Sequence, residues 1–251
     1  MIPNIVHFIW IAGQKSRRFN YLNLLAIKVA KAVQKPHRLI LHTNVWQGDD
    51  VFEEARRLFT EVYKFHPAEE IDGVSLDYPQ YQADVKRLQV LRDIGGIYLD
   101  TDMFMIRSVD EFRNNRFVMG IEGEKDGEIE ALSNALMMSE QGSPIITKWL
   151  QKIPEYLRKN IWAAHAVNLP VTLIDEYKDA FTVLPQKAFV PFDLKQNYLF
   201  SNIDEHLLDE AYAVHAWETY FKSYEISDIV NKDYMMTSDS LFARTFRKYA
   251  D

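Results

Sequence analysis

The opening segment of the chain is apolar on both faces of a strand. Side chains alternate between the two faces of a strand, and here both rows are apolar, with Ile5, Ile9 and Ile11 on one side and Val6, Phe8 and Trp10 on the other. A strand buried on both faces belongs to a parallel or mixed sheet that helices cover on both sides. This segment therefore indicates a layered arrangement of helices around a sheet.

The rest of the chain alternates between predicted strands and predicted helices. Apolar runs predict strands at residues 38–43, 62–66, 97–106 and 117–122. Apolar residues at helical spacing predict helices at residues 17–34, 51–59, 80–94, 144–159, 166–178 and 238–249. This order predicts an α/β fold with a mixed, mainly parallel sheet flanked by helices. No repeat or Gly/Ser-rich linker divides the chain, so we expect a single domain over residues 1–251.

Composition excludes several classes of protein. With 47% hydrophobic residues, the bulk of the chain is not disordered, and the absence of cysteine excludes disulfides and thiolate metal sites. A net charge of -7 argues against a dedicated nucleic-acid binder. No apolar run approaches the ~20 residues of a membrane helix, and the start of the chain, with His7 in its apolar segment, does not read as a signal peptide. A soluble, cytoplasmic enzyme or binding protein is therefore expected.

Two aspartates interrupt the apolar run at 97–106. A pair with this spacing is weak evidence alone, but residues i and i+2 of a strand lie ~6.6 Å apart on one face, so Tyr98, Asp100 and Asp102 are expected to form one row. Neighbouring carboxylates repel unless a cation, a ligand or a proton relieves them. Oxygen ligands of this kind suit Mg²⁺ or Mn²⁺, which also bind substrate phosphates. Trp10, near the carboxyl end of the first strand, is expected at the same crevice.

Three reaction classes use such a pair of carboxylates. A phosphohydrolase with a nucleophilic aspartate normally has a small or β-branched residue two positions after the motif, where this chain has Phe104. A glycosidase needs its carboxyl groups on opposite sides of the scissile bond. A glycosyltransferase needs a cation to neutralise the leaving diphosphate of a nucleotide sugar, and it fits best. A Mg²⁺-dependent phosphohydrolase and a non-catalytic nucleotide-sugar or glycan-binding protein remain as alternatives.

The residues around the aspartates carry a longer motif. Residues 83–103 read ADVKRLQVLRDIGGIYLDTDM, in which the motif positions are Asp84, Arg87, Gly95, Gly96, Tyr98, Asp100 and Asp102. This pattern resembles the signature of glycosyltransferase family 32, the DXD-motif sugar transferases, and is similar to that of the glucosylating domains of large clostridial toxins. The opening IPNIVHFIWIAG and the shorter stretches SNALMMS (133–139) and VHAW (214–217) resemble further motifs of that family.

The resemblance implies a fold and a metal. It implies a GT-A type fold in one catalytic domain, with about residues 1–125 binding the nucleotide sugar and about residues 126–251 forming the acceptor side and a closing tail. Mn²⁺ or Mg²⁺ would be bound directly by Asp102 and through water by Asp100, with His215 as an additional ligand.

The resemblance also implies donor-binding residues. Trp10 would stack on the nucleotide base, Asp84 and Arg87 would hydrogen-bond the donor sugar, Tyr98 would line the pocket, Asp100 would contact ribose or sugar, Asn134 would lie near the transferred sugar, and Trp217 would close the site over the diphosphate. Two positions depart from the family pattern. Tyr220 and Phe221 replace the usual Ser-Trp, and residues 168–170 replace the usual T-G-P.

The expected function is transfer of a hexose from a UDP-hexose or GDP-mannose, and the resemblance implies retention of configuration. The expected partners are this nucleotide-sugar donor and a glycan or lipid-linked oligosaccharide acceptor, with no nucleic acid. Such a reaction belongs to the biosynthesis of surface polysaccharides or other glycans. We expect a cytoplasmic protein that contacts the inner face of a membrane peripherally.

Overall fold

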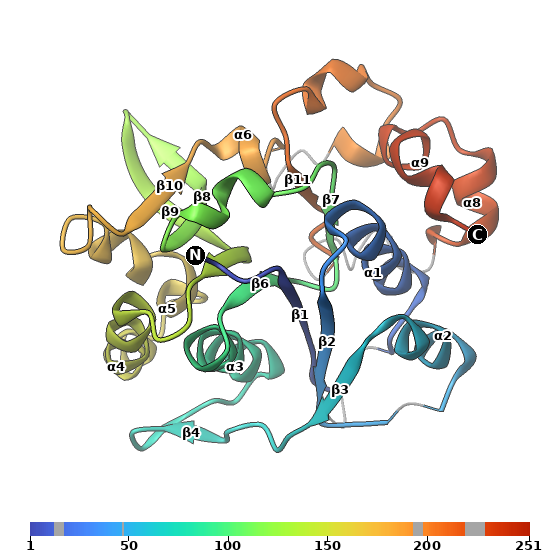
Figure 1. Ribbon diagram of the computed structural model, residues 1–251. Coiled ribbons are helices and arrows are strands. Elements are labelled where there is room, and N and C mark those ends of the chain that lie inside the picture. The colour runs from blue at the N-terminus through green and yellow to red at the C-terminus, as the bar shows by residue number, and fades with distance from the viewer. Residues whose placement is uncertain (13–17, 47, 193–197, 219–228) are drawn as a thin grey trace.

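A central seven-stranded sheet organises the molecule (Figure 1). The computed structural model describes the chain except for residues 13–17, 47, 193–197 and 219–228. The strand order is β10-β8-β9-β6-β1-β2-β3. Four pairings in this sheet are parallel and two, those of β9 with β6 and β8, are antiparallel. The predicted α/β class with a mixed, mainly parallel sheet is confirmed.

The elements have the following bounds. The strands of the main sheet are β1 (Ile5–Trp10), β2 (Arg38–Thr43), β3 (Glu61–Lys64), β6 (Gly96–Leu99), β8 (Phe117–Lys125), β9 (Glu128–Ser139) and β10 (Phe181–Leu184). Two small sheets pair β4 (Glu70–Ile71) with β5 (Val74–Ser75) and β7 (Met103–Met105) with β11 (Ala213–His215). The principal helices are α1 (Tyr21–Gln34), α2 (Asp50–Leu58), α3 (Pro79–Asp93), α4 (Pro144–Arg158), α5 (Ala164–Val167), α6 (Gln186–Phe189), α8 (Lys232–Thr237) and α9 (Leu241–Phe246). None of the helices in the described part of the chain is both long and apolar enough to cross a membrane.

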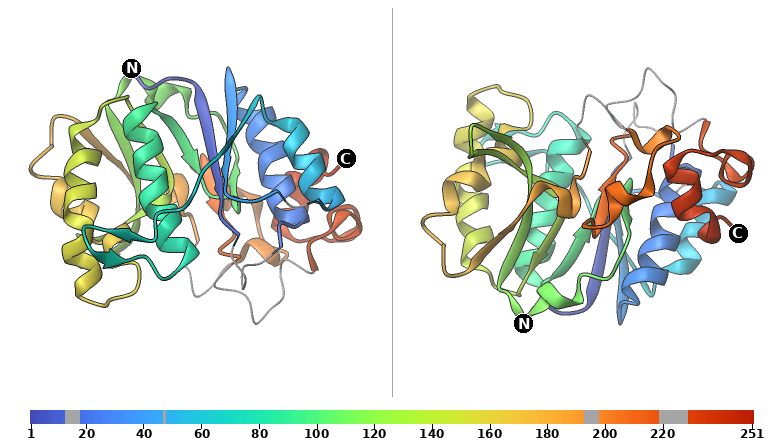
Figure 2. Two further views of the ribbon diagram at one scale, coloured as in Figure 1. Left: turned by 90° about the horizontal axis from the view of Figure 1, so that it is seen from below. Right: turned by 90° about the horizontal axis from the view of Figure 1, so that it is seen from above.

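Strand β1 lies in the interior of the sheet, next to the central strand β6, and is buried on both faces. It pairs in parallel with β2 on one side and with β6 on the other. Val6 and Phe8 belong to a hydrophobic cluster with α1 and α2, whereas Ile9 belongs to a second cluster with α3 and α4. Figure 2 shows these two helix pairs on opposite sides of the sheet. The burial expected from the alternating apolar rows is confirmed.

The predicted single strand over residues 97–106 is wrong. Strand β6 ends at Leu99, and a turn closes when the amide of Met103 donates to the carbonyl of Asp100 at 3.0 Å. Strand β7 then leaves the main sheet and pairs with β11. Aspartate is depleted in strands and favours turns, and the two aspartates, Asp100 and Asp102, explain the break. The predicted same-face row through Asp102 is therefore also wrong, because Asp102 lies in the turn.

Three other predicted elements need correction. The predicted helix at 166–178 is replaced by α5 and a 3₁₀ helix at Leu169–Leu173, which has Pro170 in its first turn. The predicted helix at 238–249 contains only α9 and a 3₁₀ turn at Arg247–Tyr249. The predicted helix at 17–34 begins at Tyr21, where the side chain of Asn20 caps it. Strand β9, the longest strand of the sheet, had not been predicted.

Two glycines set the position at which β6 begins. Gly95 and Gly96 have φ values of +74° and +120°, which other residues rarely adopt. A Cβ atom at Gly96 would also lie 2.6 Å from the carbonyl oxygen of Ile5. The tight connection from α3 to β6 therefore requires both glycines, and it places Asp100 at the carboxyl end of the strand.

A histidine pair is buried between β1 and β2. His7 Nε2 lies 2.9 Å from the carbonyl of Gly95, which can only accept, so this nitrogen carries a proton. His7 Nδ1 is then an acceptor for His42 Nε2 at 3.1 Å. Burial, with smaller effects of the cations Arg38 and Lys86, lowers the pKa of His7 to about 4 and that of His42 to about 3. Both imidazoles are therefore neutral in the folded protein.

This pair predicts a loss of stability in mild acid. In the unfolded chain both histidines become protonated below about pH 6.5. In the folded chain they stay neutral until about pH 4. The contribution of the two neutral histidines to the free energy of unfolding is therefore fully present above pH 6.5, and it is lost as the pH falls toward 4. We expect the free energy of unfolding in urea to be lower at pH 5 than at pH 7 by about 2 kcal/mol for each histidine, or about 4 kcal/mol for the pair. His42→Gln should reduce this difference, and His66→Gln, at an exposed site, should not. An equal loss in all three proteins would contradict the assignment.

Candidate active site

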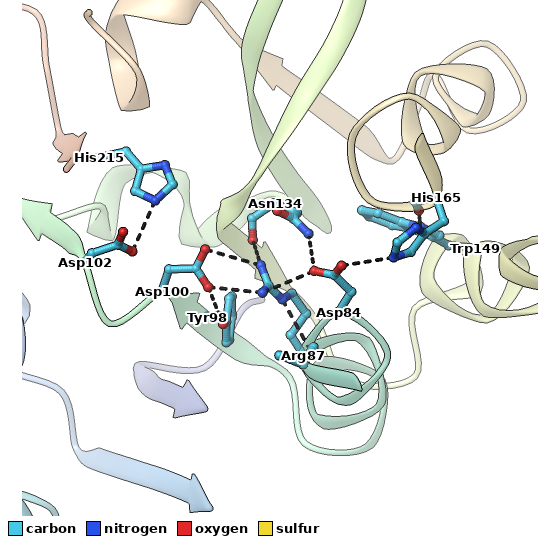
Figure 3. A network of polar contacts seen from close by, with 10 residues as sticks. Asp84, Arg87, Tyr98, Asp100, Asp102, Asn134, Trp149, His165 and His215 are labelled. Atoms are coloured by element: carbon cyan, nitrogen blue, oxygen red, sulfur yellow. Dashed lines mark hydrogen bonds and ion pairs between the residues drawn. The ribbon is translucent and has the colours of Figure 1, made fainter. Parts of the chain in front are cut away.

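The polar residues of the predicted site gather at the carboxyl end of β6. They come from α3, β6, the turn that follows β6, β9 and β11, and Figure 3 shows a network around Arg87 with the Asp102–His215 pair beside it. The strands β7 and β11 bring the two ends of this network together, since His215 pairs in register with Met103. Residues separated by more than 100 positions in the sequence therefore share one site.

Arg87 lies at the centre of the network, and only 6% of it is exposed. Its Nη2 lies 3.2 Å from Asp84 Oδ1 and 3.1 Å from Asp100 Oδ1, and its Nη1 donates to the carbonyl of Asn134 at 2.8 Å. Its guanidinium carbon is 4.5 Å from the centroid of the Tyr98 ring. Burial disfavours the charge, but the surrounding carboxylates raise the pKa of Arg87 above its usual value. The arginine thus remains a buried cation.

Asp84 is held by three neighbours. Its Oδ1 accepts from Asn134 Nδ2 at 2.8 Å as well as from Arg87, and its Oδ2 lies 3.0 Å from His165 Nε2. The carbonyl of His165 in turn accepts from Trp149 Nε1 at 2.7 Å. Burial acts to raise the pKa of Asp84, but Arg87 and the two hydrogen bonds outweigh it and hold the pKa below its usual value. Asp84 is therefore an ionised carboxylate in a fixed orientation.

Asp100 connects the arginine to the second half of the network. Its Oδ1 accepts from the hydroxyl of Tyr98 at 2.5 Å in addition to its contact with Arg87. Burial and the nearby charge of Asp102 raise the pKa of Asp100, although Arg87 opposes them. A second cation near Asp100 would relieve this repulsion.

Asp102 is held by the segment that follows β11. Its Oδ1 lies 3.2 Å from His215 Nε2, and its Oδ2 accepts from the amide of Glu218 at 2.9 Å. Trp217 has a φ of +47°, a conformation that is rare for a bulky residue. Strained backbone of this kind concentrates at functional sites, and here it lies between His215 and Glu218, the two residues that bind Asp102. Burial lowers the pKa of His215, but Asp102 outweighs it and raises the pKa above its usual value.

Three side chains form a potential metal site. Ligand atoms of Asp100, Asp102 and His215 all lie within 4.8 Å of one another. Two carboxylates suit Mg²⁺ and Mn²⁺, and an imidazole ligand is better matched to Mn²⁺ than to Mg²⁺, which prefers oxygen. The Nδ1 atom of His215 is buried, and no group in the described residues hydrogen-bonds it. The residues present therefore fit a divalent cation.

The two predicted tryptophans lie at the edge of the network. Trp10 is 7% exposed, and its ring packs edge-on against Phe19 at 5.1 Å between centroids. Trp217 is also buried, with its ring 5.2 Å from that of His215. The structure brings Trp217 close to the potential metal ligands. It places Trp10 in the core beside the site, so stacking of this residue on a base remains a prediction.

Sequence reasoning missed two of the residues that hold the site. His165 had no predicted role, because its partner Asp84 lies 81 positions away. Glu218, which is 3% exposed, accepts from Asn20 Nδ2 at 2.6 Å and from Asn23 Nδ2 at 3.1 Å, and so ties the tail to the start of α1. Only the Asn20 cap could have been read from the sequence.

The two departures from the family pattern have different outcomes. Tyr220 and Phe221 lie outside the described residues. In the 168–170 segment, Asn168 Nδ2 donates to the carbonyl of Glu130 at 2.8 Å, which joins the segment to β9.

Comparison with known proteins supports the predicted resemblance. Residues 26–118 match the family described as "Glycosyltransferase sugar-binding region containing DXD motif". This range contains the motif from Asp84 to Asp102. The predicted resemblance to the DXD-motif sugar transferases is confirmed, and the chain carries such a sugar-binding region.

Two curated relatives extend the comparison. The chain is 28% identical over 239 residues to glucan organizing enzyme 1 of Cryptococcus neoformans var. grubii, which covers 89% of this chain and 64% of that protein. It is 30% identical over 118 residues to an uncharacterized glycosyltransferase, L373, of Acanthamoeba polyphaga mimivirus, which covers 45% of this chain and 40% of that protein. The chain thus matches less than two thirds of the length of either relative.

Solved structures of glycosyltransferases also match at low identity. PaToxG glycosyltransferase has 19% identity and a TM-score of 0.47, with 70% of each chain covered. An active-site mutant of LgtC has 13% identity and a TM-score of 0.47, with 91% of this chain and 98% of that chain covered.

Loss of the central arginine should destabilise the folded protein strongly. Arg87→Met would leave Asp84 and Asp100 buried without their cation, at a cost of about 3–5 kcal/mol in the free energy of unfolding. Arg87→Lys should cost less, because it keeps the charge but loses the planar fork. Urea unfolding at pH 7 measures both. Arg92→Met is the matched control on the same helix, since the ion pair of Arg92 with Asp93 is exposed and should be worth less than about 1 kcal/mol. If the two methionine variants lost equal stability, Arg87 would not be the centre of the network.

Proposed function

We propose that this protein is a divalent-metal-dependent glycosyltransferase that transfers a hexose from a UDP- or GDP-linked donor to a hydroxyl group of a glycan acceptor. The observation that carries the proposal is the convergence of Asp100, Asp102 and His215 in a chain that contains a DXD-motif sugar-binding region. The activity of the whole protein and the identities of its substrates are part of the proposal.

In this mechanism Asp102 and Asp100 hold the cation. A bound Mn²⁺ or Mg²⁺ supplies positive charge that neutralises the departing nucleoside diphosphate. Asp102 is suited to bind it directly because the Glu218 amide fixes one of its oxygens. Asp100 is suited to a contact through water because Arg87 and Tyr98 already engage it. His215 is an additional ligand, and ligation requires that it leave its hydrogen bond with Asp102 or use its free Nδ1.

The same network provides the proposed donor-binding residues. Asp84, Arg87 and Asn134 form one rigid polar group beside the metal site, and they are suited to hold the hydroxyls of the donor sugar. The Tyr98 ring packs against Arg87, and the Trp217 ring packs against His215 on the metal side. Trp10, which packs against Phe19, is the proposed base-stacking residue. Fixing the sugar in this way lowers the barrier by orienting it for attack.

The proposed stereochemical outcome is retention. We propose that the acceptor hydroxyl approaches from the side of the leaving group and that a leaving phosphate oxygen takes its proton, which requires no separate base. The proposed setting is biosynthesis of surface polysaccharide or other glycans on free or lipid-linked oligosaccharides. A cytoplasmic location with peripheral contact at the inner membrane face belongs to the same proposal.

Release of nucleoside diphosphate from a panel of UDP- and GDP-sugars tests the proposed activity. We expect one donor to be hydrolysed slowly with Mn²⁺, and chelator to stop the reaction. Asp102→Ala should lower the rate by at least about 100-fold, whereas Asp93→Ala, at an exposed carboxylate, should leave it unchanged. Metal-dependent release of phosphate from an aryl phosphate, without donor turnover, would indicate a phosphohydrolase instead. Donor binding without turnover, even with acceptors present, would indicate a binding protein.

The contribution of His215 can be measured separately. Titration with Mn²⁺, followed by the electron paramagnetic resonance signal of the free ion, should show affinity weakened roughly 10-fold in His215→Ala, because one of three ligands is lost. His206→Ala should bind as the wild type does, since this histidine is exposed and pairs with Asp209. Unchanged affinity in His215→Ala would limit the metal site to the two carboxylates.

A further inference from the structure

An exposed group of aromatic side chains lies beside the site and has no role in the proposed donor chemistry. It consists of Tyr78 and Tyr81, at the start of α3, and Trp162, in the connection between α4 and α5; we call it the rim cluster. The ring centroids lie 5.1 Å apart for Tyr78 and Tyr81, 5.4 Å for Tyr78 and Trp162, and 5.3 Å for Tyr81 and Trp162. Tyr78 is 49% exposed and Trp162 is 58% exposed. A group of large exposed rings on a folded protein marks an interaction surface.

The rim cluster is continuous with the active-site network. The ring of Tyr81 packs edge-on against His165 at 4.6 Å between centroids, and His165 Nε2 lies 3.0 Å from Asp84 Oδ2. Asp84 is in turn paired with Arg87. Tyr81 and His165 therefore link the outer rings to Asp84, one of the proposed donor-sugar residues.

The backbone holds the rim cluster in place. Ala163 has a φ of +57°, which is unusual for a residue with a Cβ atom, and it directly follows Trp162. The Tyr81 hydroxyl hydrogen-bonds the backbone of Ala163. This contact joins the loop that carries Trp162 to α3, so the rings share one rigid support.

The chemistry of the rim cluster selects an uncharged ligand with an apolar face. Tyrosine and tryptophan offer flat apolar rings with polar edges. Asp77, an exposed carboxylate, directly precedes Tyr78 in the chain, and its charge disfavours an anionic headgroup or phosphate on this ring. A pyranose ring has a face of C–H groups and a rim of hydroxyls, and it matches both properties.

We propose that the rim cluster binds a neutral pyranose residue of the acceptor, which stacks on Tyr78 and Trp162 next to the donor site. The role of this sugar as an acceptor rests on the proposed function. Binding of the sugar to the rim cluster does not depend on it. The site would place an acceptor hydroxyl beside the network of Asp84 and Arg87, where the proposed donor sugar lies.

Saturation-transfer NMR tests the binding without donor or metal. The probes are methyl α-mannopyranoside, methyl β-glucopyranoside, methyl β-galactopyranoside and maltotetraose, each titrated in EDTA against the full chain. We expect at least one probe to bind, and Trp162→Ala and Tyr78→Ala each to weaken it roughly three- to tenfold. Trp162→Phe should retain most of the affinity. Tyr63→Ala is the matched control, because Tyr63 is 43% exposed but lies on β3, outside the rim cluster.

The outcomes separate this inference from the proposed function. Loss of sugar binding in the rim variants, with donor hydrolysis unchanged, supports both. If the rim variants lose sugar binding but the wild type hydrolyses no donor, the result supports the rim site and overturns the proposed transferase activity. Binding of no probe, or equal binding in wild type and both alanine variants, overturns the rim site even if the donor is hydrolysed. Binding to phosphatidylglycerol vesicles that the same variants abolish, in place of sugar binding, would also overturn it.

Discussion

The buried charge of Arg87 is the interaction on which the arrangement of the site depends. A cation that is 6% exposed must be paired, because an isolated buried charge is prohibitively costly. Its two carboxylate partners come from different elements, Asp84 from the same helix and Asp100 from the end of β6. The arginine therefore fixes the distance between α3 and β6. It also orients both carboxylates before any ligand arrives, which is the condition for electrostatic preorganisation.

Backbone constraints bring the partners of Arg87 and the potential metal ligands into position. The helix α3 can lead into β6 only through the positive φ values of Gly95 and Gly96, and β6 can reach the centre of the sheet only because β1 accepts it as a parallel neighbour. The Asp-Thr-Asp turn then diverts the chain to β7, and pairing of β7 with β11 brings His215 to Asp102. A continuous strand at residues 97–106 would not have made this contact. The break at Asp100–Asp102, which the predicted continuous strand did not contain, is thus the feature that brings His215 to Asp102.

The sequence patterns predicted those elements that are determined by residues close together in the chain. Strand β2 was predicted with the bounds that it has, because an apolar run of that length with flanking polar residues has few alternatives. The Asp-Thr-Asp turn was missed because its flanking residues are as apolar as a strand. His165 and Glu218 were missed for a different reason: their partners lie 81 and more than 100 positions away, and only the tertiary fold brings them together. A resemblance to a family can supply such contacts only where it has a motif, as it did for His215.

The charges of the site favour a divalent cation over a proton as the partner of Asp102. Arg87 offsets charge on Asp84 and Asp100, and His215 lies 3.2 Å from Asp102. Protonation of His215 offsets the charge of Asp102 when no metal is bound, and burial makes that proton costly. A metal bound by both aspartates would remove the repulsion that raises the pKa of Asp100, and ligation would require neutral His215. Metal binding would therefore release a proton from the site, and it would leave positive charge on the ion for the diphosphate of the proposed donor.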